Sequence, residues 1–115
     1  MLHRDWKFRI QDILDAIDVI REYTQKMEFK TFVKDRRTVD AVVRNLIIIG
    51  EAAVHIPDDI CLKHPEVPWY EMRGMRNFVV HEYYQANDSI IWDTLQVDLP
   101  PLPALLIKIF EETSE

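Results

Sequence analysis

The residues best suited to chemistry lie between Arg73 and Tyr84. If this segment is an α-helix, Arg73, Asn77, His81 and Tyr84 follow one another at intervals of four, four and three residues and line one polar stripe. Arg76 lies on the neighbouring stripe, and the Cα of His81 lies about 7.5 Å further along the axis, which a long arginine side chain can span. The spacing therefore predicts a group made of an imidazole, guanidinium groups and an amide.

Such a group is suited to handling a phosphodiester without a metal ion. Histidine titrates near neutral pH and can pass a proton to or from a hydroxyl, while arginine grips phosphate oxygens and offsets charge that grows in the transition state. The amide of Asn77 can orient either group. No second histidine, glycine-rich loop or carboxylate cluster at metal-ligand spacing lies nearby in the sequence, so phosphate binding by a P-loop and two-metal hydrolysis are disfavoured.

The same residues also fit a purely structural role. A histidine near a helix C-terminus interacts favourably with the helix dipole, and Arg76 can form a salt bridge with a carboxylate such as Glu51. Spacing alone does not separate this interpretation from the catalytic one.

Two long helices are predicted in the first half of the chain. Apolar residues recur every three or four positions over residues 6–23, and a second helical pattern opens at Lys34 or Asp35 and stops at Pro57, after a break over residues 25–33. The apolar run 46–49 could also be a buried strand, but the preceding helical period and the helix-favouring residues 51–53 favour a helix. Gly50, inside this second helix, is interpreted as allowing a close approach of another helix.

The second half is predicted to hold two further helices and a short terminal one. Residues 57–68 are rich in proline and predict a connecting loop with room for one short turn. A third helix is expected over residues 69–83, a fourth is N-capped by Asn87 or Asp88, and residues 105–110 supply a last apolar turn or two. The predicted fold class is all-α, a four- to five-helix bundle.

Length and composition predict one globular domain over residues 1–115. With 48% hydrophobic and 30% charged residues, the chain is neither collagen-like nor disordered. Its apolar runs are far shorter than the about 20 residues that cross a bilayer, and no signal-peptide pattern opens it, so we expect a cytoplasmic protein without a membrane partner. Cys61, the single cysteine, has no Cys or His at a metal-ligand spacing and is interpreted as a small buried or half-buried apolar residue.

The charge distribution is uneven. The net charge of −6 opposes long-range attraction of RNA or DNA. The segment 26–44 nevertheless carries six basic residues against three acidic ones, a local charge of +3. This stretch is either a solvated helix start and loop or one edge of a phosphate-binding face.

The segment from Arg76 to Tyr83, read as Arg, four residues, His, one residue and Tyr, resembles the R-x4-H-x-Y motif of the HEPN-superfamily ribonucleases. Asn77, directly after the arginine, also fits. Residues 49–53, Ile-Gly-Glu-Ala-Ala, resemble the IGEA element of the HepT-like branch of that superfamily. The sequence from Pro68 into the third helix and the helix over residues 88–92 resemble this branch too, so that the resemblance covers nearly the whole chain in order and length.

The resemblance implies a ribonuclease toxin of a two-gene toxin–antitoxin pair, whose antitoxin is a minimal nucleotidyltransferase of the MntA type. Such proteins are helix bundles that dimerise so that two motifs meet in one cleft, and they cut RNA without a metal or another cofactor. Carried over to this chain, Arg76 would be the phosphate and transition-state clamp, His81 the general acid/base and Asn77 a supporting polar residue. We expect attack of a ribose 2′-hydroxyl on the adjacent phosphate, leaving a 2′,3′-cyclic phosphate.

The remaining motif residues have their own expected roles. Tyr83 resembles the tyrosine to which the antitoxin attaches AMP, and Tyr84 beside it is the competing acceptor. Arg73 and Tyr84 are expected to support the site. Glu51 either pairs with Arg76 or Arg73 and orients the site, or it caps and braces the neighbouring helix end.

A homodimer would resolve one difficulty of the mechanism. One motif histidine cannot easily serve as base and acid at once, whereas two copies across a two-fold axis can divide these roles. The apolar residues Trp69, Phe78, Val79 and Trp92 are either a dimer surface or ordinary core. The alternative function is a non-catalytic binding module that recognises a nucleotidyltransferase or a nucleotide, and a weaker one is that the chain helps the nucleotidyltransferase to bind its substrate.

Overall fold

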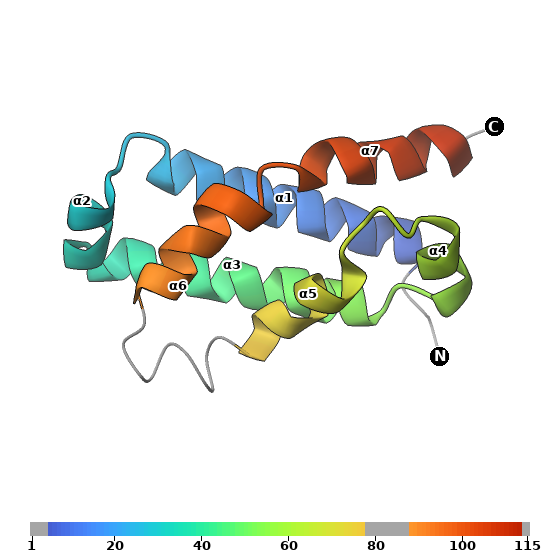
Figure 1. Cartoon of the computed structure of the whole chain (residues 1–115), viewed down its shortest axis with the longest axis horizontal. Helices are drawn as coiled ribbons and strands as arrows, with labels where there is room; N and C mark the ends of the chain where they lie inside the picture. The colour runs from blue at the N-terminus through green and yellow to red at the C-terminus, as the bar shows by residue number, and fades with distance from the viewer. Residues whose placement is uncertain (1–4, 78–87, 114–115) are drawn as a thin grey trace.

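The computed structural model describes residues 5–77 and 88–113, and these residues form helices and turns without a strand. The α-helices in chain order are α1 (Trp6–Thr24), α2 (Phe29–Lys34), α3 (Arg36–Val54), α4 (Asp58–Lys63), α5 (Trp69–Gly74), α6 (Asp88–Asp93) and α7 (Leu102–Thr113) (Figure 1). A 3-10 turn, η1 (Met75–Asn77), follows α5, and a π-helical turn, η4 (Thr94–Asp98), follows α6. The predicted all-α class is confirmed.

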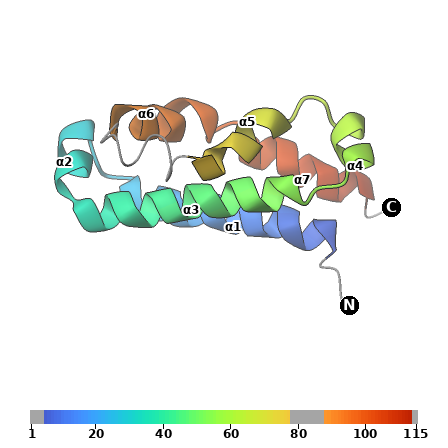
Figure 2. The ribbon, with the colours of Figure 1, turned by 90° about the horizontal axis from the view of Figure 1, so that it is seen from below.

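The helices α1 and α3 form the centre of the bundle. Each has 19 residues, and the two lie side by side along the long axis of the molecule (Figures 1 and 2). Within the run 46–49, Leu46 and Ile49 are fully buried whereas Ile48 is 37% exposed, so the run has the two faces of a helix. The helical interpretation of this run is confirmed, and the strand alternative is wrong.

The expected break over residues 25–33 contains the short helix α2, so this part of the prediction is wrong. Glu28 and Thr31 form a reciprocal capping box at its start. Phe32 is fully buried, and its ring centroid lies 5.0 Å from that of Trp92 in α6. Burial of this one aromatic side chain gives a six-residue helix the tertiary support that its own length does not supply.

Asp35 ends α2 and begins α3. Its carboxylate accepts a hydrogen bond from the backbone amide of Thr38 at 3.2 Å and one from the Thr38 hydroxyl at 2.8 Å. These hydrogen bonds, with the hydroxyl as the larger contributor, hold the pKa of Asp35 below its usual value. The expected opening of the second long helix at Lys34 or Asp35 therefore agrees with the observed N-cap.

The proline-rich connection after α3 is more ordered than a loop. Residues 58–63 form α4, which fills half of the segment 57–68, where a connecting loop with one short turn was expected. The backbone carbonyl of His64 accepts a hydrogen bond from the indole nitrogen of Trp69 at 3.0 Å, and both residues are buried. Trp69 therefore belongs to the core and fixes the start of α5, as the structural interpretation of this residue predicted.

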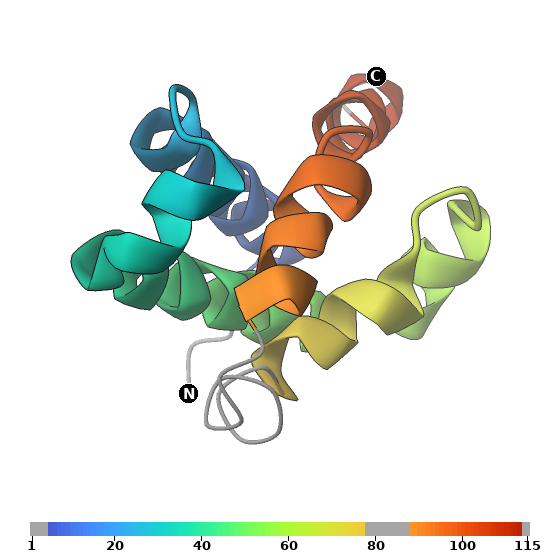
Figure 3. The ribbon, with the colours of Figure 1, turned by 60° about the vertical axis from the view of Figure 1, so that its left-hand side comes forward.

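The C-terminal part closes the bundle. The helix α6 packs against α2 and leads through η4 to α7 (Figure 3), and α7 packs against α1. Leu102, Leu106 and Ile109 of α7 are fully buried. The helix has 12 residues, more than the one or two turns expected. Trp92 is only partly buried but packs against the core, as the core interpretation predicted.

Among the described residues, no single helix has the length and apolar character needed to cross a membrane. One bent pair, Asp88–Asp98 with Leu102–Glu112 at an angle of 48°, reaches that length and composition only when its two parts are taken together.

Candidate nucleotide-binding site

Gly50 brings α3 into direct contact with the backbone that carries Arg76. A Cβ atom at Gly50 would lie 2.5 Å from the backbone nitrogen of Arg76, 2.9 Å from its Cβ and 3.2 Å from the carbonyl oxygen of Arg73. These separations are shorter than the 3.5–4.0 Å of ordinary contacts, so only glycine allows this approach. The predicted close approach at Gly50 is confirmed.

The helix that carries the site ends earlier than predicted. A continuous helix was expected over residues 69–83, but α5 ends at Gly74 and the chain continues as the 3-10 turn η1. Glycine favours such an ending because it is a poor helix former, and the tighter turn lets Met75 reach the core, where it is 3% exposed. The single α-helical stripe expected for Arg73 and Asn77 is therefore interrupted.

Glu51 holds the guanidinium group of Arg76 from the neighbouring helix. Nη1 of Arg76 donates to Oε1 of Glu51 at 3.2 Å. The Arg76 side chain is 46% exposed and that of Glu51 is 51% exposed, so the ion pair lies at the surface and leaves part of the guanidinium open. The pairing with Arg76 agrees with the first interpretation of Glu51, in which it pairs with Arg76 or Arg73. Whether Glu51 thereby orients the site stays a prediction.

Arg73 has a different partner on α4. Its Nη2 donates to the sulfur of Cys61 at 3.1 Å. Cys61 is half-buried, as expected, and burial raises the pKa of its thiol while the Arg73 guanidinium opposes this effect. Arg73 is therefore fixed by a neutral group and keeps its positive charge beside the site.

Arg73, Arg76 and Asn77 line one open pocket of about 370 Å³ on the outer side of α5 and η1. Its other lining residues are Val54, Tyr70, Glu71 and Gly74. The structure thus brings together three of the residues singled out in the sequence, although the continuous helix expected to align them is absent. Two guanidinium groups and an amide around one hollow are suited to binding a phosphate group.

Six residues named above lie outside the described residues. They are the expected general acid/base His81, the expected AMP acceptor Tyr83, its competitor Tyr84, the apolar residues Phe78 and Val79, and the N-cap candidate Asn87. The described residues on both sides of this stretch contact α3. Arg76 contacts Gly50 before it, and Asp88 after it forms an ion pair with Arg36 at 2.9 Å.

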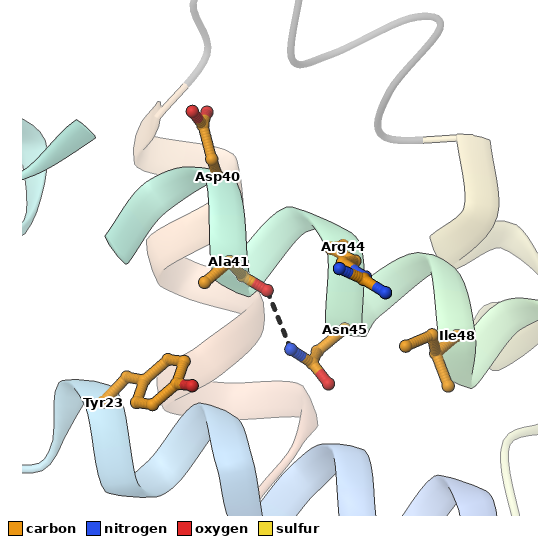
Figure 4. Close-up of a pocket in the computed structure, with 6 residues that line it drawn as sticks. All are labelled: Tyr23, Asp40, Ala41, Arg44, Asn45 and Ile48. Atoms are coloured by element: carbon orange, nitrogen blue, oxygen red, sulfur yellow. Dashed lines mark hydrogen bonds between the residues drawn. The ribbon is translucent and has the colours of Figure 1, made fainter. Parts of the chain in front are cut away.

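A second hollow lies between α1 and α3. It measures about 450 Å³ and is lined by Tyr23, Asp40, Ala41, Arg44, Asn45 and Ile48 (Figure 4). Arg44 comes from the basic segment 26–44, but Asp40 lines the same hollow, so the charges of the two side chains offset each other. This hollow is therefore less suited to a phosphate group than the pocket beside Arg76.

Two side chains near the site were missed by sequence reasoning. Tyr70 lies before the motif and is 84% exposed on α5. His55 follows α3, and its Nδ1 lies 2.8 Å from the backbone oxygen of Glu51, one helical turn from the carboxylate that holds Arg76. The only sequence signal for Tyr70 was its position three residues before Arg73 on the same helical face.

No group of three or more His, Cys, Asp or Glu side chains is placed to hold a metal ion within residues 5–77 and 88–113.

Comparison with known proteins agrees with the motif. A family model described as "Ribonuclease HepT-like" matches residues 13–109. A protein of Thermococcus cleftensis named "Probable ribonuclease HepT" is 39% identical over 107 residues, which are 93% of this chain and 94% of the relative. A Methanocaldococcus jannaschii protein named "Putative RNase MJ1216" is 36% identical over 97% of this chain and 93% of its own length. No solved structure matches significantly. The resemblance drawn from the motif and the IGEA element is therefore confirmed.

Proposed function

Because this chain belongs to the HepT-like ribonuclease family, we propose that it is an endoribonuclease that cuts RNA with the residues of the R-x4-H-x-Y motif. In this proposal Arg76 holds the scissile phosphate and offsets the charge of the transition state, His81 transfers protons, and Asn77 supports the two groups. The reaction is a transesterification that needs no metal ion.

One observation carries the assignment of Arg76. Gly50 of α3 contacts the Arg76 backbone, while Glu51 next to it contacts the Arg76 guanidinium. Two adjacent residues of one long helix thus contact both the backbone and the side chain of this arginine. Such fixed positioning is what a transition-state clamp requires, because a preorganised charge does not have to reorganise during the reaction.

The proposed reaction begins with attack of a ribose 2′-oxygen on the adjacent phosphorus. The bond from phosphorus to the 5′-oxygen of the next nucleotide breaks, which yields a 2′,3′-cyclic phosphate and a free 5′-hydroxyl. One imidazole accepts the 2′-hydroxyl proton and another donates a proton to the leaving 5′-oxygen. DNA lacks the attacking hydroxyl and should not be cut.

The two proton transfers support the proposal of a homodimer in which both copies of His81 face one cleft. If each cleft needs two intact copies, mixing wild type with His81→Ala under conditions of subunit exchange lowers cleavage as the square of the wild-type fraction. A linear dependence on that fraction would show that one chain cleaves by itself. Sedimentation of the wild type should report twice the 13.7 kDa mass of the chain.

We further propose that a minimal nucleotidyltransferase of the MntA type neutralises this protein by adding AMP to Tyr83. A nucleotide at that position places an anion beside the arginine and would compete with RNA. The protein purified after co-expression with this nucleotidyltransferase should gain the mass of one AMP, and fragment mass spectrometry should place it on Tyr83. Modification of Tyr84 would correct the site, and an unmodified but inactive complex would leave only steric inhibition.

Growth arrest on expression tests the proposal in cells. Arg76→Ala and His81→Ala should each relieve arrest while circular dichroism shows unchanged helix content, and Leu62→Ala, on the exposed face of α4, should not. Arrest that survives both motif changes contradicts a toxin acting through these residues. The binding-module alternative then becomes the better account.

A further inference from the structure

The pocket beside Arg76 has an aromatic side chain at its edge that the fold does not use. On α5, Trp69 and Met72 are buried in the core, whereas Tyr70 on the opposite face is 84% exposed and lines the pocket with Arg73. An aromatic ring left in water loses the free energy that burial would supply, and no packing role for Tyr70 explains it. Its exposure therefore points to a ligand.

The position of Tyr70 relative to the two arginines indicates which ligand. Tyr70 and Arg73 lie at i and i+3 on α5, and both line the same pocket with Arg76 and Asn77 of η1. A flat ring next to two guanidinium groups is the arrangement by which proteins bind single-stranded nucleic acid, with the base stacked on the ring and the phosphate held by the cations.

We propose that this pocket is a subsite for one RNA nucleotide, in which the base stacks on Tyr70 while Arg73 and Arg76 hold the phosphate. The proposal rests on the ribonuclease function proposed above and names the residue that would bind the nucleotide next to the scissile bond. Stacking is tolerant of sequence because every base has a flat face, so this subsite would bind any of the four bases.

Size and charge are consistent with one nucleotide. The pocket of about 370 Å³ falls within the roughly 300–1,000 Å³ typical of small-ligand sites. The described contacts of the two arginines use Nη1 of Arg76 and Nη2 of Arg73, and each guanidinium has five N–H donors, so donors remain for phosphate oxygens. Glu71 also lines the pocket, and its carboxylate can accept hydrogen bonds from base amino groups. Because this carboxylate repels the phosphate, we expect the phosphate to lie on the arginine side of the pocket.

The hollow between α1 and α3 supplies a matched control. Tyr23 is 48% exposed there and lines that hollow with Arg44 and Asp40 (Figure 4). Tyr23→Ala therefore removes the same side chain from a similar hollow that lacks the pair of arginines. Tyr70→Phe is the second control because it keeps the ring and removes only the hydroxyl.

The test uses the full-length protein and a fluorescent single-stranded RNA that carries 2-aminopurine and is 2′-O-methylated throughout, so that 2′-hydroxyl attack cannot cut it. Stacking on a ring quenches 2-aminopurine, a signal that a merely structural role for Tyr70 would not change. Cleavage of ordinary RNA is measured on the same preparations, and thermal unfolding confirms that the variants are folded.

We expect Tyr70→Ala to lose the quenching and to weaken binding of this RNA by about 5- to 150-fold, the range that corresponds to about 1–3 kcal/mol for one stacked base. Tyr70→Phe and Tyr23→Ala should bind and quench like the wild type. In cleavage of ordinary RNA, Tyr70→Ala should raise KM more than it lowers kcat.

The outcomes separate this subsite from the ribonuclease function itself. Wild type that cuts RNA, together with a Tyr70→Ala variant that binds and quenches normally, overturns the subsite and leaves the ribonuclease. Quenching that depends on Tyr70 in a protein that cuts no RNA supports the subsite and overturns the ribonuclease. Wild type that does not quench the probe overturns the subsite, and so does a Tyr70→Ala change that alters self-association without altering quenching.

Discussion

Replacing Gly50 by alanine should damage the site far more than it damages the fold. The new Cβ would lie 2.5 Å from the backbone nitrogen of Arg76, whereas an ordinary contact begins near 3.5 Å, so the Arg76 backbone has to retreat by about 1 Å. The nearest atoms belong to the backbone and to the first side-chain carbon of Arg76, and neither can swing aside as the end of a flexible side chain could.

The expected cost in stability is small because two terms oppose each other. Overpacking of this kind costs about 1–3 kcal/mol, while alanine is better than glycine inside a helix by about 1 kcal/mol, so the net loss in the free energy of unfolding should not exceed about 2 kcal/mol. A displacement of about 1 Å at a catalytic group can nevertheless cost about 100-fold in rate. Gly50→Ala should therefore cleave RNA about 100-fold more slowly while remaining folded.

Leu62→Ala is the control, because Leu62 is 81% exposed on α4 and does not line the pocket. It should cleave RNA at the wild-type rate and unfold at the same urea concentration. The assay is urea unfolding followed by circular dichroism, with initial cleavage rates on the same preparations. Wild-type activity in Gly50→Ala would refute the reasoning, and so would an equal loss of activity in the Leu62 variant.

Three further changes test the residues around this contact. Glu51→Gln should alter the free energy of unfolding by less than about 1 kcal/mol, because the ion pair with Arg76 is half-exposed. It should nevertheless lower kcat without raising KM, since the Arg76 guanidinium stays charged but is less well oriented. An unchanged kcat would show that Glu51 does not orient the arginine. His55→Ala should keep the rate of RNA cleavage within about threefold of wild type, whereas His81→Ala should lower that rate by about 100-fold or more. An equal loss in both variants would contradict the assignment of proton transfer to two copies of His81. Asp35→Asn should destabilise the protein at neutral pH and not in acid, because the pKa of Asp35 is depressed in the folded state. The stabilisation by Asp35 is full above about pH 4 and is lost as the pH falls through the folded pKa. Urea midpoints of wild type and variant that differ equally at about pH 7 and about pH 3 would contradict this.

The long helices could be predicted because their apolar residues repeat at the helical period. Residues 6–23 agree closely with α1, and Asp35 as a cap marks the start of α3. The short helix α2 could not be predicted in this way, because six residues contain too few turns for a period to appear. Its stability depends on the burial of Phe32 against Trp92, which is 60 positions away in the sequence.

At the site, the sequence predicted the contacts that depend on residue type. Gly50 indicated a close approach, and Glu51 was among the partners expected for Arg76. The end of α5 at Gly74 was missed, because a single glycine inside a helical pattern is usually tolerated. The exposure of Tyr70 and the place of His55 beside Glu51 follow from how α3 and α5 pack together, which no local pattern encodes.

The most direct test of the central claim is cleavage of a mixed pool of transfer and messenger RNA by purified protein in EDTA, with analysis of the product ends. Intact mass first verifies that the wild type is unmodified. The account predicts that the wild type cuts and leaves 2′,3′-cyclic phosphate and 5′-hydroxyl ends, while Arg76→Ala and His81→Ala are slower by about 100-fold or more. Unmodified wild type that cuts nothing, or variants that cut as well as it does, would contradict the account.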